Sequence, residues 1–149
     1  MTRLYIGIDP GKSGGVAFIR GRERRACKMP AVDHDLWDLL VGNDPATVVI
    51  EKVASSPQMG VRSAFTFGHS AGLIRGVCIA AGLQMEYVTP QQWQKHYGLI
   101  VHGRKLGRGD TDKKNRNKSK AKELFPELKI THSIADALLL AEYGRRLGL

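Results

Sequence analysis

The 149-residue chain lacks a long apolar stretch, and no run approaches the roughly 20 residues that a membrane-spanning helix needs. Residues 1–7 do not show a charged region followed by an apolar segment, so we expect no secretion signal. These two absences predict a cytoplasmic protein that does not associate with a membrane.

Cysteine is scarce. The two cysteines, Cys27 and Cys78, have a spacing that fits no zinc-binding motif. Two thiols also do not make the disulfide framework of a small secreted protein. We interpret both as reduced structural residues of a cytoplasmic protein.

Acidic residues are outnumbered: the chain has 23 Lys and Arg against 14 Asp and Glu, a net charge of +9. Such an excess favours an anionic partner, with nucleic acid first and an acidic membrane surface second. Hydrophobic residues make up 42%, enough for a folded core, and the length suits one domain over residues 1–149.

Apolar patterns predict strands over residues 4–9, 16–19 and 24–29, the first two joined by a glycine-rich turn. A helix over 33–41, a buried strand over 47–50 and a long helix over 63–81 follow. The remaining elements are a strand over 84–88, a helix that starts after Thr89-Pro90, a flexible loop over 99–117, and helices over 118–124 and 133–147. This order indicates an α/β fold with a mixed five-stranded sheet flanked by helices, and it is compatible with an RNase H-like fold.

Three glycines in the long predicted helix, Gly68, Gly72 and Gly76, are four residues apart and share a helical face. We expect this face to pack closely on the sheet or on a partner helix.

Three carboxylates stand at the ends of predicted elements. Asp9 ends the first strand, Glu51 ends the fourth, and Asp136 lies in the first turn of the last helix. Strand ends of an open α/β sheet converge on the crevice where ligands bind. Clustered carboxylates repel one another unless cations neutralise them, and Mg²⁺ prefers such oxygen ligands. Two ions roughly 3.5–4 Å apart support phosphodiester hydrolysis.

Each carboxylate also has a structural explanation. Asp9 precedes Pro10-Gly11 and fits a turn. Asp136 follows Ser133 at the spacing of a capping box. Glu51 is harder to explain in this way, because a carboxylate after so apolar a strand needs a partner.

Taken together, three motifs resemble the RuvC family of Holliday junction resolvases, nearest to its short bacteriophage versions. They are residues 6–11 (IGIDPG), 49–53 (VIEKV) and 135–138 (ADAL), with residues 68–72 (GHSAG) and Lys118-Ser119 in support. The resemblance implies an RNase H-like fold, a homodimer, two Mg²⁺ or Mn²⁺ ions, and paired symmetric nicks in branched DNA at a four-way junction.

The resemblance also implies roles for single residues. Asp9, Glu51 and Asp136 match metal ligands, and Lys118 matches a basic residue that contacts phosphate near the metals. The family usually has a second acidic or histidine ligand about one turn before the last Asp, where this chain has Ser133 and His132. His132 is our candidate for the fourth ligand, which favours Mn²⁺; the alternative is a surface histidine on a loop.

A second departure concerns junction opening. Some relatives carry an aromatic wedge three residues after the Glu, and this chain has Ala54 there. Phe65 and Phe67 are candidates to replace it, although such residues more often belong to a helix core. For Trp93 and Tyr97, likewise, we expect core packing rather than base stacking.

Residues 104–122 hold nine basic side chains and two acids, Asp110 and Asp112. We interpret this segment as a clamp on the DNA backbone that is mobile until phosphate neutralises it. The nine residues are Arg104, Lys105, Arg108, Lys113, Lys114, Arg116, Lys118, Lys120 and Lys122.

The sequence therefore predicts a crossover junction endodeoxyribonuclease with no small-molecule substrate. Other readings remain: a related nuclease that cuts forks, flaps or RNA–DNA hybrids, and a non-catalytic module that binds branched DNA. Carboxylates that repel DNA argue against the second. Sugar kinases and actin-like ATPases also begin with an apolar strand, Asp and Gly, but they need a second phosphate loop and a much longer chain.

Overall fold

The computed structural model describes residues 2–100 and 110–149, except the side chains of residues 110–112. Its centre is a sheet of five strands in the order β3-β2-β1-β4-β5. The first three strands are antiparallel neighbours, and β4 and β5 run parallel to β1. The predicted mixed five-stranded sheet is thus confirmed. The strands are β1 (Leu4–Asp9), β2 (Gly15–Arg20), β3 (Glu23–Lys28), β4 (Ala46–Glu51) and β5 (Gln84–Val88).

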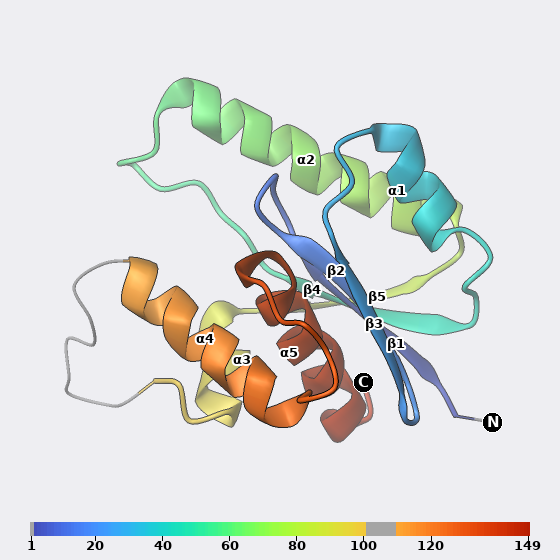
Figure 1. Ribbon diagram of the computed structural model, residues 1–149. Coiled ribbons are helices and arrows are strands. Elements are labelled where there is room, and N and C mark those ends of the chain that lie inside the picture. Colours follow the sequence, from blue (N-terminus) through green and yellow to red (C-terminus); the bar gives the residue numbers. More distant parts are fainter. Residues whose placement is uncertain (1, 101–109) are drawn as a thin grey trace.

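Helices cover both faces of this sheet (Figure 1). On one face lie α1 (Asp33–Leu40) and α2 (Val61–Ala80), packed on alternate strand residues such as Ile6 and Phe18. On the other lie α3 (Pro90–His96), α4 (Asp110–Leu124) and α5 (His132–Leu147), packed on Ala17, Ile19 and Val49. The central strands are apolar on both sides because each of their faces is covered.

Helix α5 lies directly against β1 and β2. A methyl group on Gly7 would overlap the backbone of Ala137 and Ala141, so only glycine permits this approach. Helix α5 ends at Gly148, which has a left-handed backbone conformation with φ of +63°. The close packing fixes the start of α5, and hence Asp136, over the end of β1.

The largest departure from the predicted elements is α4, which begins at Asp110 and includes residues that we expected in a flexible loop. The sequence shows no apolar period there because the buried side of the helix is very narrow. Its fully buried residues, over 113–124, are Asn117 and Ala121. Packing of this narrow stripe on α5 stabilises the helix, which is a tertiary effect that no local pattern displays.

The glycines of α2 give the second correction. A Cβ at Gly68, Gly72 or Gly76 would meet no atom of the described chain within 4 Å, so this face does not pack on the sheet. Ile74 and Cys78 fill that role from the other side of the helix. The prediction of packing on a partner helix stays open.

One local prediction is confirmed, the start of α3. Thr89 caps α3, with Pro90 at the first helical position and a reciprocal pair of hydrogen bonds to Gln92. Cys27 and Cys78 are free thiols, the first exposed and the second buried. In the part of the chain that the structure describes, no helix is long and apolar enough to cross a membrane.

Candidate active site

One end of the sheet brings the three predicted carboxylates together. Strands β1 and β4 are parallel neighbours, so Asp9 and Glu51 lie at the same end of the sheet, where both strands finish. We call this end, with Asp9, Glu51 and Asp136, the carboxylate edge. Helix α5 contributes Asp136 from above β1. All three side chains are half-buried. The arrangement follows from topology, since the three residues are far apart in sequence.

Burial raises the pKa of all three carboxyl groups, and loss of solvation is the largest cause in each case. For Asp9, the negative charges of Asp136 and Glu51 add to it and raise the pKa to about 8. The charge of Asp136 also raises the pKa of Glu51. These groups therefore share one electrostatic environment, in which the nearby lysine charges only partly offset the effect of burial.

Asp136 does not close a capping box. Helix α5 begins at His132 after the N-cap residue Thr131, which makes no side-chain cap hydrogen bond. Asp136 is therefore the fifth residue of the helix, in its second turn rather than its first. Its Oδ1 instead accepts a hydrogen bond of 3.0 Å from Nδ2 of Asn117, which is buried on α4. The structural explanation of Asp136 as a capping residue is wrong.

Glu51 also has one neutral donor. Nε1 of Trp93, on α3, donates a hydrogen bond of 2.9 Å to Oε2 of Glu51. This hydrogen bond lowers the pKa of Glu51, against the larger effect of burial. The Trp93 side chain is fully buried and Tyr97 is nearly so, which confirms core packing for both.

Neither donor could be assigned from sequence. Trp93 carries an apolar body with one N–H that must find a partner when buried, which was the available signal. Asn117 is hidden among lysines, and only the packing of α4 on α5 shows that it faces Asp136.

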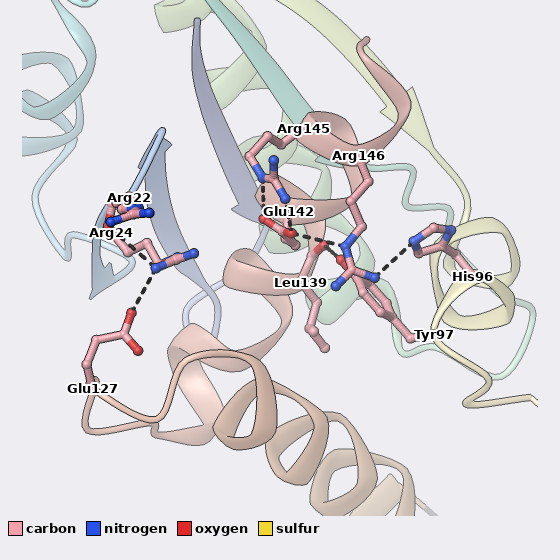
Figure 2. Close-up of polar contacts among 9 residues, drawn as sticks. All are labelled: Arg22, Arg24, His96, Tyr97, Glu127, Leu139, Glu142, Arg145 and Arg146. Carbon is pink, nitrogen blue, oxygen red and sulfur yellow. Dashed lines mark hydrogen bonds and ion pairs between the residues drawn. The ribbon is translucent and has the colours of Figure 1, made fainter. Parts of the chain in front are cut away.

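A network of charged residues holds α3 against α5 (Figure 2). Glu142, nearly buried, accepts hydrogen bonds from Arg145 at 2.7 and 2.8 Å and from Arg146 at 3.0 Å. The Arg146 guanidinium lies 5.3 Å from the centre of the Tyr97 ring, whose hydroxyl donates to the backbone oxygen of Leu139. These contacts fix α3 and so fix the direction from which Trp93 reaches Glu51.

A cavity of about 280 Å³ opens beside Asp9 and Asp136. His132 and Ser133 line it from α5, and Lys114 lines it from α4. The positive charges of Lys113 and Lys114 lower the pKa of Asp136, against its burial. Lysines of α4 therefore reach the carboxylates.

The family resemblance points to Lys118 for this position, but Lys118 does not line the cavity, and Lys114, one turn earlier on the same face, does. The role of Lys118 stays a prediction. His132, also a prediction as a ligand, is the first residue of α5 and not part of a loop.

A second cavity, of about 490 Å³, lies on the other side of the carboxylates. Glu51 and Pro10 line it from the sheet, Gly72 and Arg75 from α2, and Tyr87 from β5. The carboxylate edge is thus hollowed on both sides.

The basic segment is partly helical. Lys113, Lys114, Arg116, Lys118, Lys120 and Lys122 belong to α4. Lys120 forms an ion pair of 3.1 Å with Glu123. Arg104, Lys105 and Arg108 lie outside the described residues.

The aromatic candidates for a wedge lie on the first half of α2. Phe65 is 76% exposed, so the expectation that it belongs to a helix core is wrong. Phe67 is half-buried, and its ring lies against Gly11 in the turn after Asp9. Ala54 is exposed in the loop between β4 and α2.

The donor chemistry of the edge suits a divalent cation. The carboxylates offer the hard oxygen ligands that Mg²⁺ and Mn²⁺ prefer, and burial raises the pKa of each, which a bound cation would reverse. Among residues 2–100 and 113–149, however, no three His, Cys, Asp or Glu side chains already form a metal-binding group. The chemistry and the burial of these side chains therefore fit a divalent metal, which Asp9, Glu51 and Asp136 would hold.

Comparison with solved structures agrees with this architecture. The chain superposes on Thermus thermophilus RuvC with a TM-score of 0.65 and 18% identity, covering 97% of this chain and 96% of that one. For the same protein in complex with a Holliday junction substrate, the TM-score is 0.66 and the identity 16%, covering 98% of this chain and 96% of that one.

The yeast mitochondrial Holliday junction resolvase Ydc2 gives a TM-score of 0.56 and 10% identity, covering 97% of this chain and 78% of that one. No family model and no curated protein matches the sequence. At these identities the likeness establishes the fold, which is the predicted RNase H-like fold of the RuvC resolvases.

Proposed function

We propose that this protein is a metal-dependent endonuclease that resolves four-way DNA junctions by paired symmetric nicks. The observation that carries the proposal is the convergence of Asp9, Glu51 and Asp136 at one sheet edge, in a fold shared with proteins named as junction resolvases. Two divalent ions bound there would supply Lewis acidity and a nucleophile at neutral pH.

The chain's own residues prepare that edge. Asp9, Glu51 and Asp136 present oxygen ligands, and His132 lies beside Asp9 and Asp136 as a candidate fourth ligand. Trp93 and Asn117 hold Glu51 and Asp136 in fixed directions. Lys114 places positive charge beside Asp9 and Asp136, where the scissile phosphate would develop negative charge, and Lys118, one turn further along α4, adds positive charge next to that place.

The lysines of α4 bind the DNA backbone. They extend from the carboxylate edge along one helix, so a strand that enters the site also passes over positive charge. Lysine contacts to phosphate carry little sequence information, so sequence preference at the cut has another origin.

The chain pairs with a second copy through the exposed face of α2. Val61, Phe65 and Ile79 are 89%, 76% and 59% exposed, and the glycines between them leave open space. Small residues on such a face let a second helix approach closely. Two copies would present two carboxylate sites, as paired nicks require.

The test is cleavage of a labelled synthetic four-way junction in Mg²⁺ or Mn²⁺, next to duplex, fork and RNA–DNA hybrid substrates. Symmetric nicks on the junction, absent in Asp9→Asn, are the expected result. A loss of the preference for Mn²⁺ in His132→Ala would identify His132 as a ligand.

Other results would redirect the proposal. Cleavage of the hybrid or fork with the junction intact would keep the nuclease and change its substrate. Tight junction binding without cleavage by the parent protein and the variant would identify a non-catalytic DNA-binding module.

A further inference from the structure

The β2–β3 hairpin carries a second concentration of positive charge, separate from α4. Residues 20–28 hold Arg20, Arg22, Arg24, Arg25 and Lys28 against a single acid, Glu23. Lys28 lies opposite Gly15, at the same end of the sheet as Asp9, so the concentration near the tip consists of the four arginines, and no role at the carboxylate edge accounts for them.

The tip of the hairpin lies at the opposite end of the sheet from the carboxylates. Arg20 is opposite Leu4 in the β1–β2 ladder, whereas Gly15 is opposite Asp9. The two places are therefore five residue steps apart along the strand, which amounts to roughly 17 Å. Figure 1 shows this turn near the N-terminus, and Gly21 lies next to Thr2.

Most of these arginines are not neutralised within the chain. Over residues 2–100 and 113–149, Arg24 is the one hairpin arginine in an ion pair, with Glu127 at 3.3 Å (Figure 2). The Arg20, Arg22 and Arg25 side chains are exposed. Their positive charge is available to an external anion.

A shallow cavity of about 220 Å³ lies beside them. Leu4 and Phe18 line it with apolar surface, and its charged lining is three arginines against one acid: Arg20, Arg24, Arg25 and Glu23. The Arg25 guanidinium lies 4.0 Å from the centre of the Phe18 ring, which restrains its direction. A restrained arginine loses less side-chain entropy when it binds than a free one.

Charge on an edge strand has a simpler use, which is to prevent strand addition by another chain. Lysine is the residue best suited to preventing strand addition, yet the basic residues near the tip of this hairpin are arginines, whereas those of α4 are mainly lysines. The planar guanidinium binds phosphate through two parallel hydrogen bonds. The choice of residue therefore indicates phosphate recognition in addition to protection of the edge.

We propose that the β2–β3 hairpin is a second contact with the DNA backbone, which binds a duplex arm of the substrate at a distance from the cut. The inference rests on the proposed function, since that function supplies the DNA. At 3.4 Å per nucleotide along one strand, the hairpin lies about five base pairs from the carboxylate edge.

The experiment compares the full chain with the triple variant Arg20→Gln, Arg22→Gln and Arg25→Gln, which keeps the Arg24 ion pair. Fluorescence anisotropy measures the dissociation constant for junctions whose arms are closed by DNA loops and are about 4 or about 15 base pairs long, over a range of salt concentrations. Circular dichroism confirms that the variant is folded. Glu23→Gln is the matched control, because it removes negative charge from the same hairpin.

For long arms we expect the dissociation constant of the triple variant to rise roughly tenfold or more. The slope of its logarithm against the logarithm of salt concentration should fall by an amount equivalent to about two to three phosphate contacts. For short arms the loss should shrink to about twofold or less, and Glu23→Gln should bind long arms more tightly. Equal losses at both arm lengths, or no loss at either, would overturn the inference. If the parent protein binds neither junction, the proposed function itself fails, and that result is distinct.

Discussion

At the scale of single residues, the buried carboxylates that would bind metal also lower the stability of the folded protein when they are ionised. Asp9 shows this most clearly, because burial and the charges of Asp136 and Glu51 raise its pKa to about 8. In the unfolded chain the same carboxyl group loses its proton near pH 4. Between these values the folded protein holds more protons than the unfolded one, so the free energy of unfolding must fall as pH rises.

We therefore expect that, without divalent cations, thermal stability decreases from about pH 4 to about pH 8. Asp9→Asn should flatten this decrease and raise the free energy of unfolding at pH 8 by about 1 kcal/mol or more, because it removes a buried charge. Thermal melts at several pH values in a chelator measure both effects. A parent protein that becomes more stable over this interval would contradict the electrostatic account.

Trp93 permits a second prediction at this scale. Trp93→Phe keeps an aromatic ring in the core and removes the N–H that holds Glu51. Partners of this kind orient metal ligands, so the affinity for Mn²⁺ should fall by about 10- to 100-fold in calorimetric titration.

Tyr97→Phe is the matched control, because it removes another buried hydrogen bond, to Leu139, away from the edge. Both variants should lose some stability, and only Trp93→Phe should lose affinity. An equal loss of affinity in both would mean that Trp93 acts through the fold alone.

At the scale of elements, the approach of α5 to β1 determines where Asp136 lies. Gly7 makes that approach possible, since any side chain there overlaps the helix backbone. Gly7→Ala should reduce the free energy of unfolding by about 3 kcal/mol or more, because backbone must move to admit the methyl group.

Gly68→Ala is the comparison, because a methyl group there meets open space on α2. Measured by urea denaturation where the chain is monomeric, it should be neutral or raise stability by up to about 1 kcal/mol. A Gly7→Ala protein as stable as its parent would show that α5 does not lie as close as described.

At the scale of the whole molecule, the exposed face of α2 has two proposed uses: pairing with a second copy and opening of the junction. Phe65 lies on this face and separates them. Phe65→Ala should convert a dimer to a monomer in sedimentation velocity if its ring packs between copies. A variant that stays dimeric but cuts junctions more slowly, while binding them as before, would assign the ring to junction opening. If the parent protein sediments as a monomer at all concentrations, the pairing is excluded.

Local patterns in the sequence determined much of this molecule. The apolar strand runs, the Thr89-Pro90 helix start and the carboxylates at Asp9 and Glu51 follow from short stretches of chain, because apolar patterning and turn chemistry are local. The order of the elements was enough to predict the mixed sheet, and the set of motifs was enough to predict its fold.

Only the tertiary structure decided the rest. The length of α4, the exposure of the α2 glycines and the partners of the carboxylates depend on contacts between segments far apart in the chain. Asn117 and Trp93 are ordinary residues in sequence, and they become part of the site because α4 packs on α5 and α3 is held there too. A sequence read segment by segment does not contain those distances, since burial and neighbouring charge arise only when the segments meet.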